Sequence, residues 1–103
     1  MKKDIQTYES TCFSVISAAG TAKSCFLEAI ENAKEGQEYQ SLLDDGYNAY
    51  VEAAKAHAVA LQLEAEDKLD NGLLLIHAET ILSSAETIWN LAETIIDLIN
   101  KTK

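Results

Sequence analysis

The sequence predicts an all-α protein, a single domain over residues 1–103 whose three helices form an antiparallel, up-down-up bundle. The chain contains no proline and only four glycines, whereas an all-β protein of this size would need many more turn residues. Alanine, leucine, glutamate and isoleucine, which dominate the composition, together favour helix. Apolar residues recur at helical spacing, and short turns between helices make neighbours run antiparallel.

The first helix is expected from about Asp4 to Lys34. One face of it carries residues that recur every seven positions: Ile5, Cys12, Ala19, Phe26 and Ala33. Gly36 is expected to end the helix, because glycine readily adopts the left-handed conformation that follows a helix C-terminus. Gly20 lies within the helix, where we expect it to allow close helix packing rather than a break.

The second helix is expected from about Gln37 to Asp67. Its predicted apolar face contains six residues at helical spacing: Leu43, Tyr47, Tyr50, Ala54, His57 and Leu61. Gly46 is the weak point of this helix, because glycine disfavours helix interiors. A short turn is predicted from Asp67 to Gly72, where Asp70, Asn71 and Gly72 supply turn chemistry.

The third helix, from about Leu73 to Asn100, has the clearest pattern. The tetrapeptide Ala-Glu-Thr-Ile occurs three times at heptad spacing, beginning at Ala78, Ala85 and Ala92. One seam therefore contains Leu74, Ile81, Ile88 and Ile95, and the adjoining seam contains His77, Ser84, Leu91 and Leu98. Such heptads are typical of coiled-coil packing. We expect this wide face to meet both the other helices of the chain and further copies of it.

The net charge of −9 argues against nucleic-acid binding, which needs basic residues to neutralise phosphates. It also argues against docking on anionic lipid. We find no secretory signal and no apolar stretch long enough to span a bilayer, so we expect a cytoplasmic protein without direct membrane insertion. Cys12 and Cys25 would lie about 20 Å apart on one helix, and we expect free thiols.

Two histidines are the candidates for chemistry, since phosphate loops, zinc-spaced ligands and nucleophile elbows are absent from the sequence. His77 follows an apolar run, and a neutral imidazole can attack a phosphoryl group near neutral pH. His57 is the weaker candidate, with a supporting role. A histidine on an apolar helix face is also compatible with a purely structural role, and Glu79, Glu86 and Glu93 are interpreted as a solvated face.

The first helix resembles that of the lactose/cellobiose-type enzyme IIA family of the sugar phosphotransferase system. The resemblance begins in the segment from Phe13 to Ser24, with an apolar pair followed by Ala-Gly-x-Ala-x-Ser, and continues to Gly36. Farther along, Ala56-His57 and the run from Leu75 to Ala78 resemble the family's second helix and the segment around its phosphorylated histidine. The resemblance covers roughly Cys12 to Leu98.

Two residues close to His77 depart from the family pattern, and Ala60 and Leu61 stand where the family has a Gln-Thr pair after Ala56-His57. The family's aspartate, which binds a metal at the trimer axis, corresponds to Thr80, and its second histidine corresponds to Ile81. Threonine is a poorer ligand for a hard cation than a carboxylate. We therefore expect no metal site and no cofactor.

The resemblance implies a phosphoryl carrier. His77 would accept phosphate from the phosphocarrier protein and pass it to a cysteine of enzyme IIB during uptake of a disaccharide. The family also implies a homotrimer, a coiled-coil-like assembly of nine helices with Ile81, Ile88 and Ile95 at the threefold axis. The alternative is a diverged bundle of the same fold that acts only in protein–protein interaction.

Overall fold

The computed structural model describes residues 2–67 and 72–103 of the chain. Helix α1 spans Lys2–Lys34, α2 spans Gln40–Asp67 and α3 spans Gly72–Thr102. No strand occurs among the described residues. The prediction of an all-helical chain with three helices is confirmed. The turn predicted at Asp70 and Asn71 lies outside the described residues.

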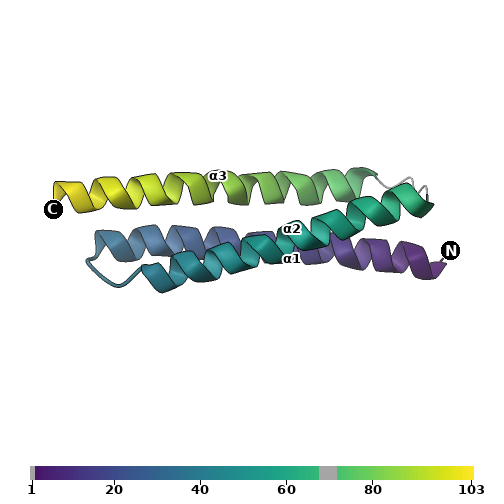
Figure 1. Cartoon of the computed structure of the whole chain (residues 1–103), viewed down its shortest axis with the longest axis horizontal. Helices are drawn as coiled ribbons and strands as arrows, with labels where there is room; N and C mark the ends of the chain where they lie inside the picture. Colours follow the sequence, from purple (N-terminus) through teal and green to yellow (C-terminus); the bar gives the residue numbers. More distant parts are fainter. Residues whose placement is uncertain (1, 68–71) are drawn as a thin grey trace.

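The three helices lie side by side as a rod with extents of 57 × 17 × 15 Å (Figure 1). The two marked ends of the chain lie at opposite ends of the rod (Figure 1). Side-chain hydrogen bonds join His57 to Glu79, Tyr50 to Glu86 and Tyr39 to Asn100. Tyr39 directly precedes α2, and across the three pairs the first residue number falls as the α3 number rises, so α2 and α3 run in opposite directions.

Two local sequence signals determine where α1 ends and where α2 begins. Gly36 has a φ of 72°, the left-handed conformation expected after a helix end. Helix α2 begins at Gln40 rather than at the predicted Gln37, because the Glu38 carboxylate accepts hydrogen bonds from the Ser41 backbone N–H at 2.9 Å and the Ser41 hydroxyl at 2.7 Å. Glu38 therefore caps the first turn of α2.

Small residues at heptad spacing form the centre of the core on all three helices. Helix α1 buries Cys12, Ala19, Phe26 and Ala33, as predicted. On α3 the buried column is Ala78, Ala85 and Ala92, and Ile81 and Ile88 pack beside it against the chain's own core. The helix axes can approach closely along this alanine column. The larger apolar residues of α3 lie beside the column, so the wide apolar face of α3 is only partly covered.

The predicted apolar face of α2 was misplaced by one position. The buried residues are Gly46, Ala53 and Ala60, whereas Tyr47 and Leu61 remain 47% and 43% exposed. Gly46 lies against Phe26 of α1, and the six residues predicted to be buried lie beside this column and are at most partly buried.

The two interior glycines have roles opposite to those predicted. A Cβ atom on Gly20 would meet nothing within 4 Å, so this glycine permits no close packing within the chain. A Cβ atom on Gly46 would lie 2.6 Å from Cε1 of Phe26. Gly46, the expected weak point, is therefore the position where two helices need the absence of a side chain.

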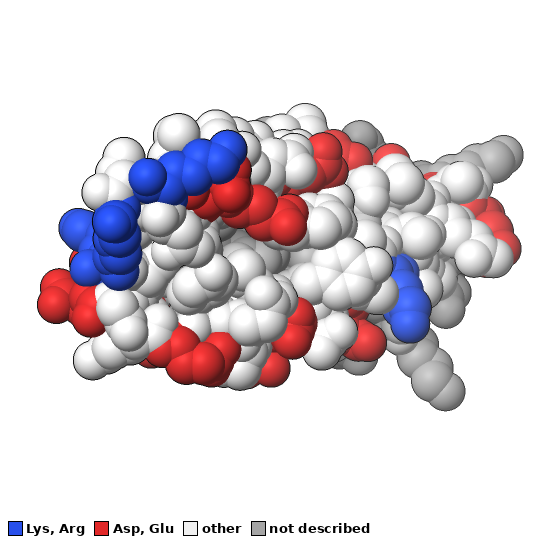
Figure 2. Space-filling view, turned by 60° about the vertical axis from the view of Figure 1, so that its left-hand side comes forward, with Lys and Arg blue, Asp and Glu red and all other residues white. Residues whose placement is uncertain are grey.

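Among the charged residues of the chain, acidic ones outnumber basic ones by 17 to 8. On the face shown in Figure 2, carboxylates are distributed along the rod, whereas most of the visible lysine atoms gather at one end. Over the residues described, none of the three helices has an apolar segment that is long enough to traverse a bilayer.

Candidate functional site

His77 lies on the second turn of α3 and is exposed to solvent. Leu73 and Ile76 on the same turns are 84% and 58% exposed. Within the part of the chain that the structure describes, the His77 imidazole makes no side-chain hydrogen bond or ion pair. Its ring nitrogens are therefore accessible to a reactant approaching from outside, as nucleophilic chemistry requires.

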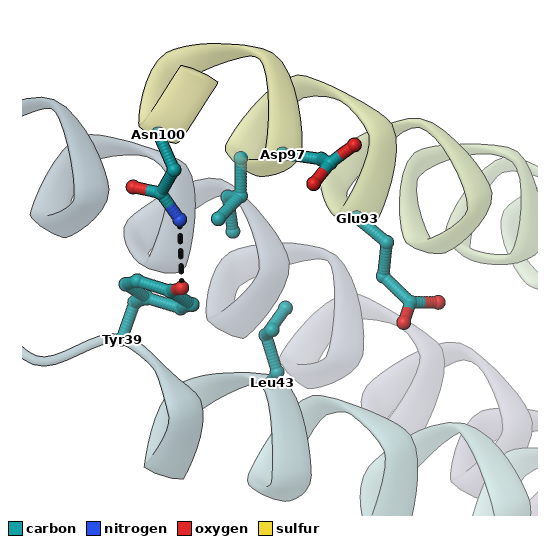
Figure 3. A pocket seen from close by; sticks show the side chains of 6 residues that line it. Tyr39, Leu43, Glu93, Asp97 and Asn100 are labelled. Carbon is teal, nitrogen blue, oxygen red and sulfur yellow. Dashed lines mark hydrogen bonds between the residues drawn. The ribbon is translucent and has the colours of Figure 1, made fainter. Parts of the chain in front are cut away.

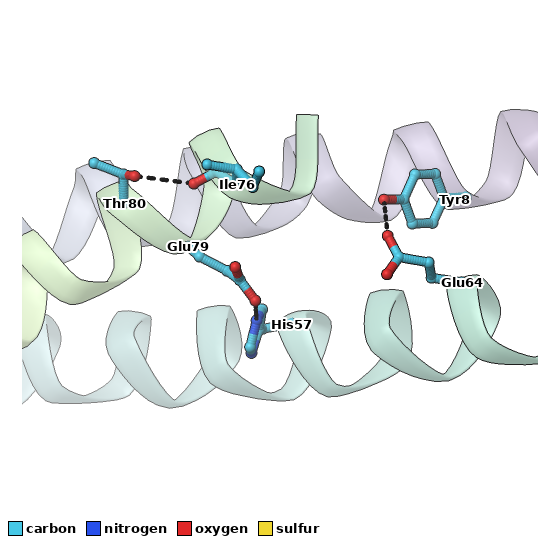
Figure 4. Close-up of polar contacts among 6 residues, drawn as sticks. All are labelled: Tyr8, His57, Glu64, Ile76, Glu79 and Thr80. Carbon is cyan, nitrogen blue, oxygen red and sulfur yellow. Dashed lines mark hydrogen bonds and ion pairs between the residues drawn. The ribbon is translucent and has the colours of Figure 1, made fainter. Parts of the chain in front are cut away.

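His57 is held against α3 by a carboxylate. Its Nε2 lies 2.8 Å from Oε2 of Glu79 (Figure 4), and its side chain is 22% exposed. With a proton on Nε2, the imidazole donates to the carboxylate. Glu79 was expected on a solvated face, and its side chain is 43% exposed, but the sequence did not predict its contact with His57 of α2.

Further polar bonds join α2 to each of the other two helices. The hydroxyl of Tyr50 donates to Oε2 of Glu86 at 2.6 Å. This hydrogen bond, together with burial, raises the pKa of Tyr50 to about 12. Closer to the N-terminus of the chain, the fully buried Tyr8 donates to Glu64 at 2.9 Å (Figure 4). Burial, reinforced by this bond, raises the pKa of Tyr8. Helix α2 is thus fixed by tyrosine–carboxylate and histidine–carboxylate pairs.

The structure does not bring the two histidines together within one chain. His77 and Glu79 are two positions apart on α3, so they project about 200° apart around the helix axis. Since His57 is bonded to Glu79, it lies on the flank of α3 that faces α2, and His77 lies on another flank. Within one chain, the two histidines therefore lie on different flanks of α3.

The side chains at the two departures from the family pattern are already engaged. The Thr80 hydroxyl donates to the backbone carbonyl of Ile76 at 2.9 Å (Figure 4), and Ile81 packs against the core. A hydroxyl used within its own helix is a poor ligand for a hard cation. Elsewhere in the described ranges, no three His, Cys, Asp or Glu side chains converge as metal ligands. These residues do not fit the family's axial metal.

The comparisons with known proteins give one match. A family model described as the lactose/cellobiose-specific IIA subunit of the PTS system matches residues 10–100. The matched region contains both histidines and nearly all of the three helices. In the comparisons with curated proteins and with solved structures, nothing matches the chain.

Proposed function

Because the chain belongs to the lactose/cellobiose-specific IIA family of the phosphotransferase system, we propose that it is a cytoplasmic phosphoryl carrier. It accepts a phosphoryl group on His77 from the phosphocarrier protein and passes it to enzyme IIB during uptake of a disaccharide. The observation that carries this proposal is the exposed, unbonded imidazole of His77 on α3, within the region matched by the family model.

The chemistry asks little of the protein beyond access and orientation. An unprotonated ring nitrogen of His77 attacks the phosphorus in line with the bond to the carrier, so that an N–P bond forms as the carrier leaves. The second transfer runs the same way, with a cysteine sulfur of enzyme IIB as the attacking atom. A helix is a rigid support for such a nucleophile.

His57 is assigned a supporting role through α3 rather than by contact with phosphate. Its bond to Glu79 holds α2 against the turn of α3 that carries His77. Loss of that bond would loosen the turn without removing the nucleophile. We therefore class His57 as a positioning residue.

We further propose that the protein works as a homotrimer, the state implied by the family resemblance. Of the seam expected at the threefold axis, Ile95 is 37% exposed, whereas Ile81 and Ile88 are partly buried against the chain's own core. The support for assembly is therefore a neighbouring apolar surface on α3, where Leu91 and Leu98 are 53% and 56% exposed. On α1, Phe13 and Leu27 are 59% and 50% exposed. A small alanine core buries limited apolar area, so covering this surface with further copies would stabilise the chain.

One observation favours the alternative, a non-catalytic bundle of the same fold. Thr80 and Ile81 stand where the family has polar groups beside the phosphorylated histidine, and both are engaged in helix or core contacts. In that reading the fold and the assembly persist, while phosphoryl transfer is lost.

The deciding experiment is incubation of the protein with the general phosphotransferase components and labelled phosphoenolpyruvate, followed by mass measurement. We expect one phosphoryl group per chain. His77→Ala should abolish labelling, and His57→Ala should only slow it. The His77→Ala variant should give the same circular dichroism spectrum and sedimentation as the unmutated protein. Its loss of label then cannot be attributed to unfolding or to a change of assembly.

Two results would contradict the relay. If the unmutated protein takes up no label from a competent carrier, the non-catalytic bundle is the better description. If His77→Ala is labelled normally, the acceptor is another residue, and His57→Ala then identifies or excludes the second histidine.

A further inference from the structure

A hollow between α2 and α3, far from His77, combines carboxylates with aromatic rings. It has a volume of about 230 Å³, and six residues line it: Gln40, Leu43, Asp44, Tyr47, Trp89 and Glu93. We call it the Trp89 hollow. Glu93 lies sixteen residues after His77, about 24 Å along the helix, so this hollow is separate from the proposed phosphoryl site.

The aromatic wall of the hollow is built by tight ring packing. The centroid of Trp89 lies 5.3 Å from that of Tyr47, with the ring planes tilted by 55°. Phe26 stacks on the other side of the core, 6.3 Å from Trp89 with an interplanar angle of 11°. Tyr47 nonetheless remains 47% exposed. The hollow therefore presents a fixed aromatic and aliphatic surface to solvent.

Glu93 supplies an uncompensated negative charge at the rim. Across the residues that the structure describes, its carboxylate has no hydrogen bond or ion pair. Asp44, on the opposite rim, accepts only a neutral hydrogen bond from Gln40 Nε2 at 3.0 Å. No lysine lines the hollow.

The neighbouring hollow provides a contrast. It has about 170 Å³ and is lined by Tyr39, Leu43, Glu93, Ile96, Asp97 and Asn100 (Figure 3). Its Asp97 is paired with Lys101 at 3.3 Å, and its Asn100 donates to the Tyr39 hydroxyl at 2.9 Å. Glu93 borders both hollows and, among the described residues, pairs with no cation. Asp44 of the Trp89 hollow also has no cationic partner there, whereas Asp97 of the neighbouring hollow has Lys101, so a cation is favoured on the Trp89 side.

From this combination we propose that the Trp89 hollow binds a primary alkylammonium group. The ammonium donates hydrogen bonds to the Glu93 and Asp44 carboxylates, and these bonds are strong because donor and acceptor carry opposite charges. The alkyl stem packs on Leu43 and on the rings of Tyr47 and Trp89, where ring faces also attract the positive charge. A free amine and a lysine side chain offer the same group, and the experiment separates them.

The test uses Trp89 as its own reporter, because it is the only tryptophan in the chain. The full-length protein is titrated with n-butylammonium at constant ionic strength, and the Trp89 fluorescence and indole N–H resonance are followed. We expect a saturable change with a dissociation constant of about a millimolar, as befits so small a ligand. Tetramethylammonium, which lacks N–H donors, should bind several-fold more weakly.

Matched variants locate the binding. Glu93→Gln keeps the size of the side chain and should weaken binding about tenfold. Glu52→Gln removes the same charge from an exposed position on α2 outside the hollow and should have little effect. Tyr47→Leu should weaken binding several-fold by removing a ring. Circular dichroism establishes that each variant keeps its helices.

A peptide with one lysine, acetyl-Gly-Lys-Gly-amide, distinguishes a lysine side chain of a protein from a free amine as the source of the ammonium group. Tighter binding of this peptide than of butylammonium identifies a protein-borne lysine as the occupant, and comparable or weaker binding identifies a free amine. The proposal is overturned if neither ligand gives saturation, if tetramethylammonium binds as well as the primary amines, or if Glu93→Gln and Glu52→Gln reduce binding equally. None of these results depends on whether His77 is phosphorylated.

Discussion

Substituting Gly46 by alanine tests the closest contact in the bundle. The added Cβ atom would lie 2.6, 2.8 and 3.0 Å from three atoms of the Phe26 ring, Cε1, Cδ1 and Cζ. Phe26 is fully buried, and Trp89 lies stacked against it. Because the ring is enclosed, it has little room to move away, so the helices themselves must separate.

The size of the effect follows from two opposing contributions. Alanine is favoured over glycine within a helix by about 1 kcal/mol. Overpacking of a filled core costs about 1–3 kcal/mol, and contacts with three atoms of an enclosed ring place Gly46→Ala near the upper end. We expect a net loss of about 2 kcal/mol of unfolding free energy, which corresponds to a melting temperature lower by roughly 10 °C.

Gly20→Ala is the matched control, because it makes the same change where no atom lies within 4 Å. It should stabilise the protein by up to about 1 kcal/mol. Urea unfolding followed by circular dichroism measures both variants at one protein concentration, with the oligomeric state checked by sedimentation, since assembly shifts apparent stability. A Gly46→Ala protein as stable as the unmutated one would refute the packing argument.

Three further predictions concern pH, thiols and assembly. Since the pKa of Tyr50 is raised from 10.0 to about 12, the stability contributed by the protonated Tyr50 hydroxyl is complete below pH 10 and is lost as the pH rises through about 12. The urea midpoint of the protein should therefore fall over that pH range, and it should fall less in Glu86→Gln. Burial raises the pKa of both cysteine thiols, but only Cys12 is fully buried, so in single-cysteine variants Ellman's reagent should label Cys25 in the native protein and Cys12 only after unfolding. Leu98→Asp, at a 56% exposed position, should shift sedimentation towards smaller species without loss of helicity. Asn90→Asp on the same helix should leave sedimentation unchanged. If Leu98→Asp also leaves the assembly unchanged, the α3 surface is not the subunit contact.

The number of helices and most of their limits could be predicted from the sequence, because they depend on neighbours along the chain. Heptad spacing identified the buried column of α1, and Gly36 identified the end of that helix through the left-handed conformation it adopts. The start of α2 was placed three residues early, because the cap from Glu38 to Ser41 competes with a helical conformation at Gln37.

For the candidate site, the sequence identified both histidines but not their surroundings. The exposure of His77 agrees with an accessible nucleophile, whereas the bond from His57 to Glu79 joins residues 22 positions apart. Such a pair depends on the rotation and axial alignment of α2 against α3. Periodicity along one helix contains no information on either quantity.

By itself, then, the sequence determined which segments are helical, that they carry apolar faces, and that His77 and His57 are the candidates for chemistry. Only the tertiary structure decided that the alanine column of α3 faces inward, that Gly46 rather than Gly20 is closely packed, and that Glu93 stays unpaired beside Trp89. The reason is physical: helix formation depends on local bonds and propensities, whereas the choice among adjacent apolar columns depends on which side chains fit together across three helices.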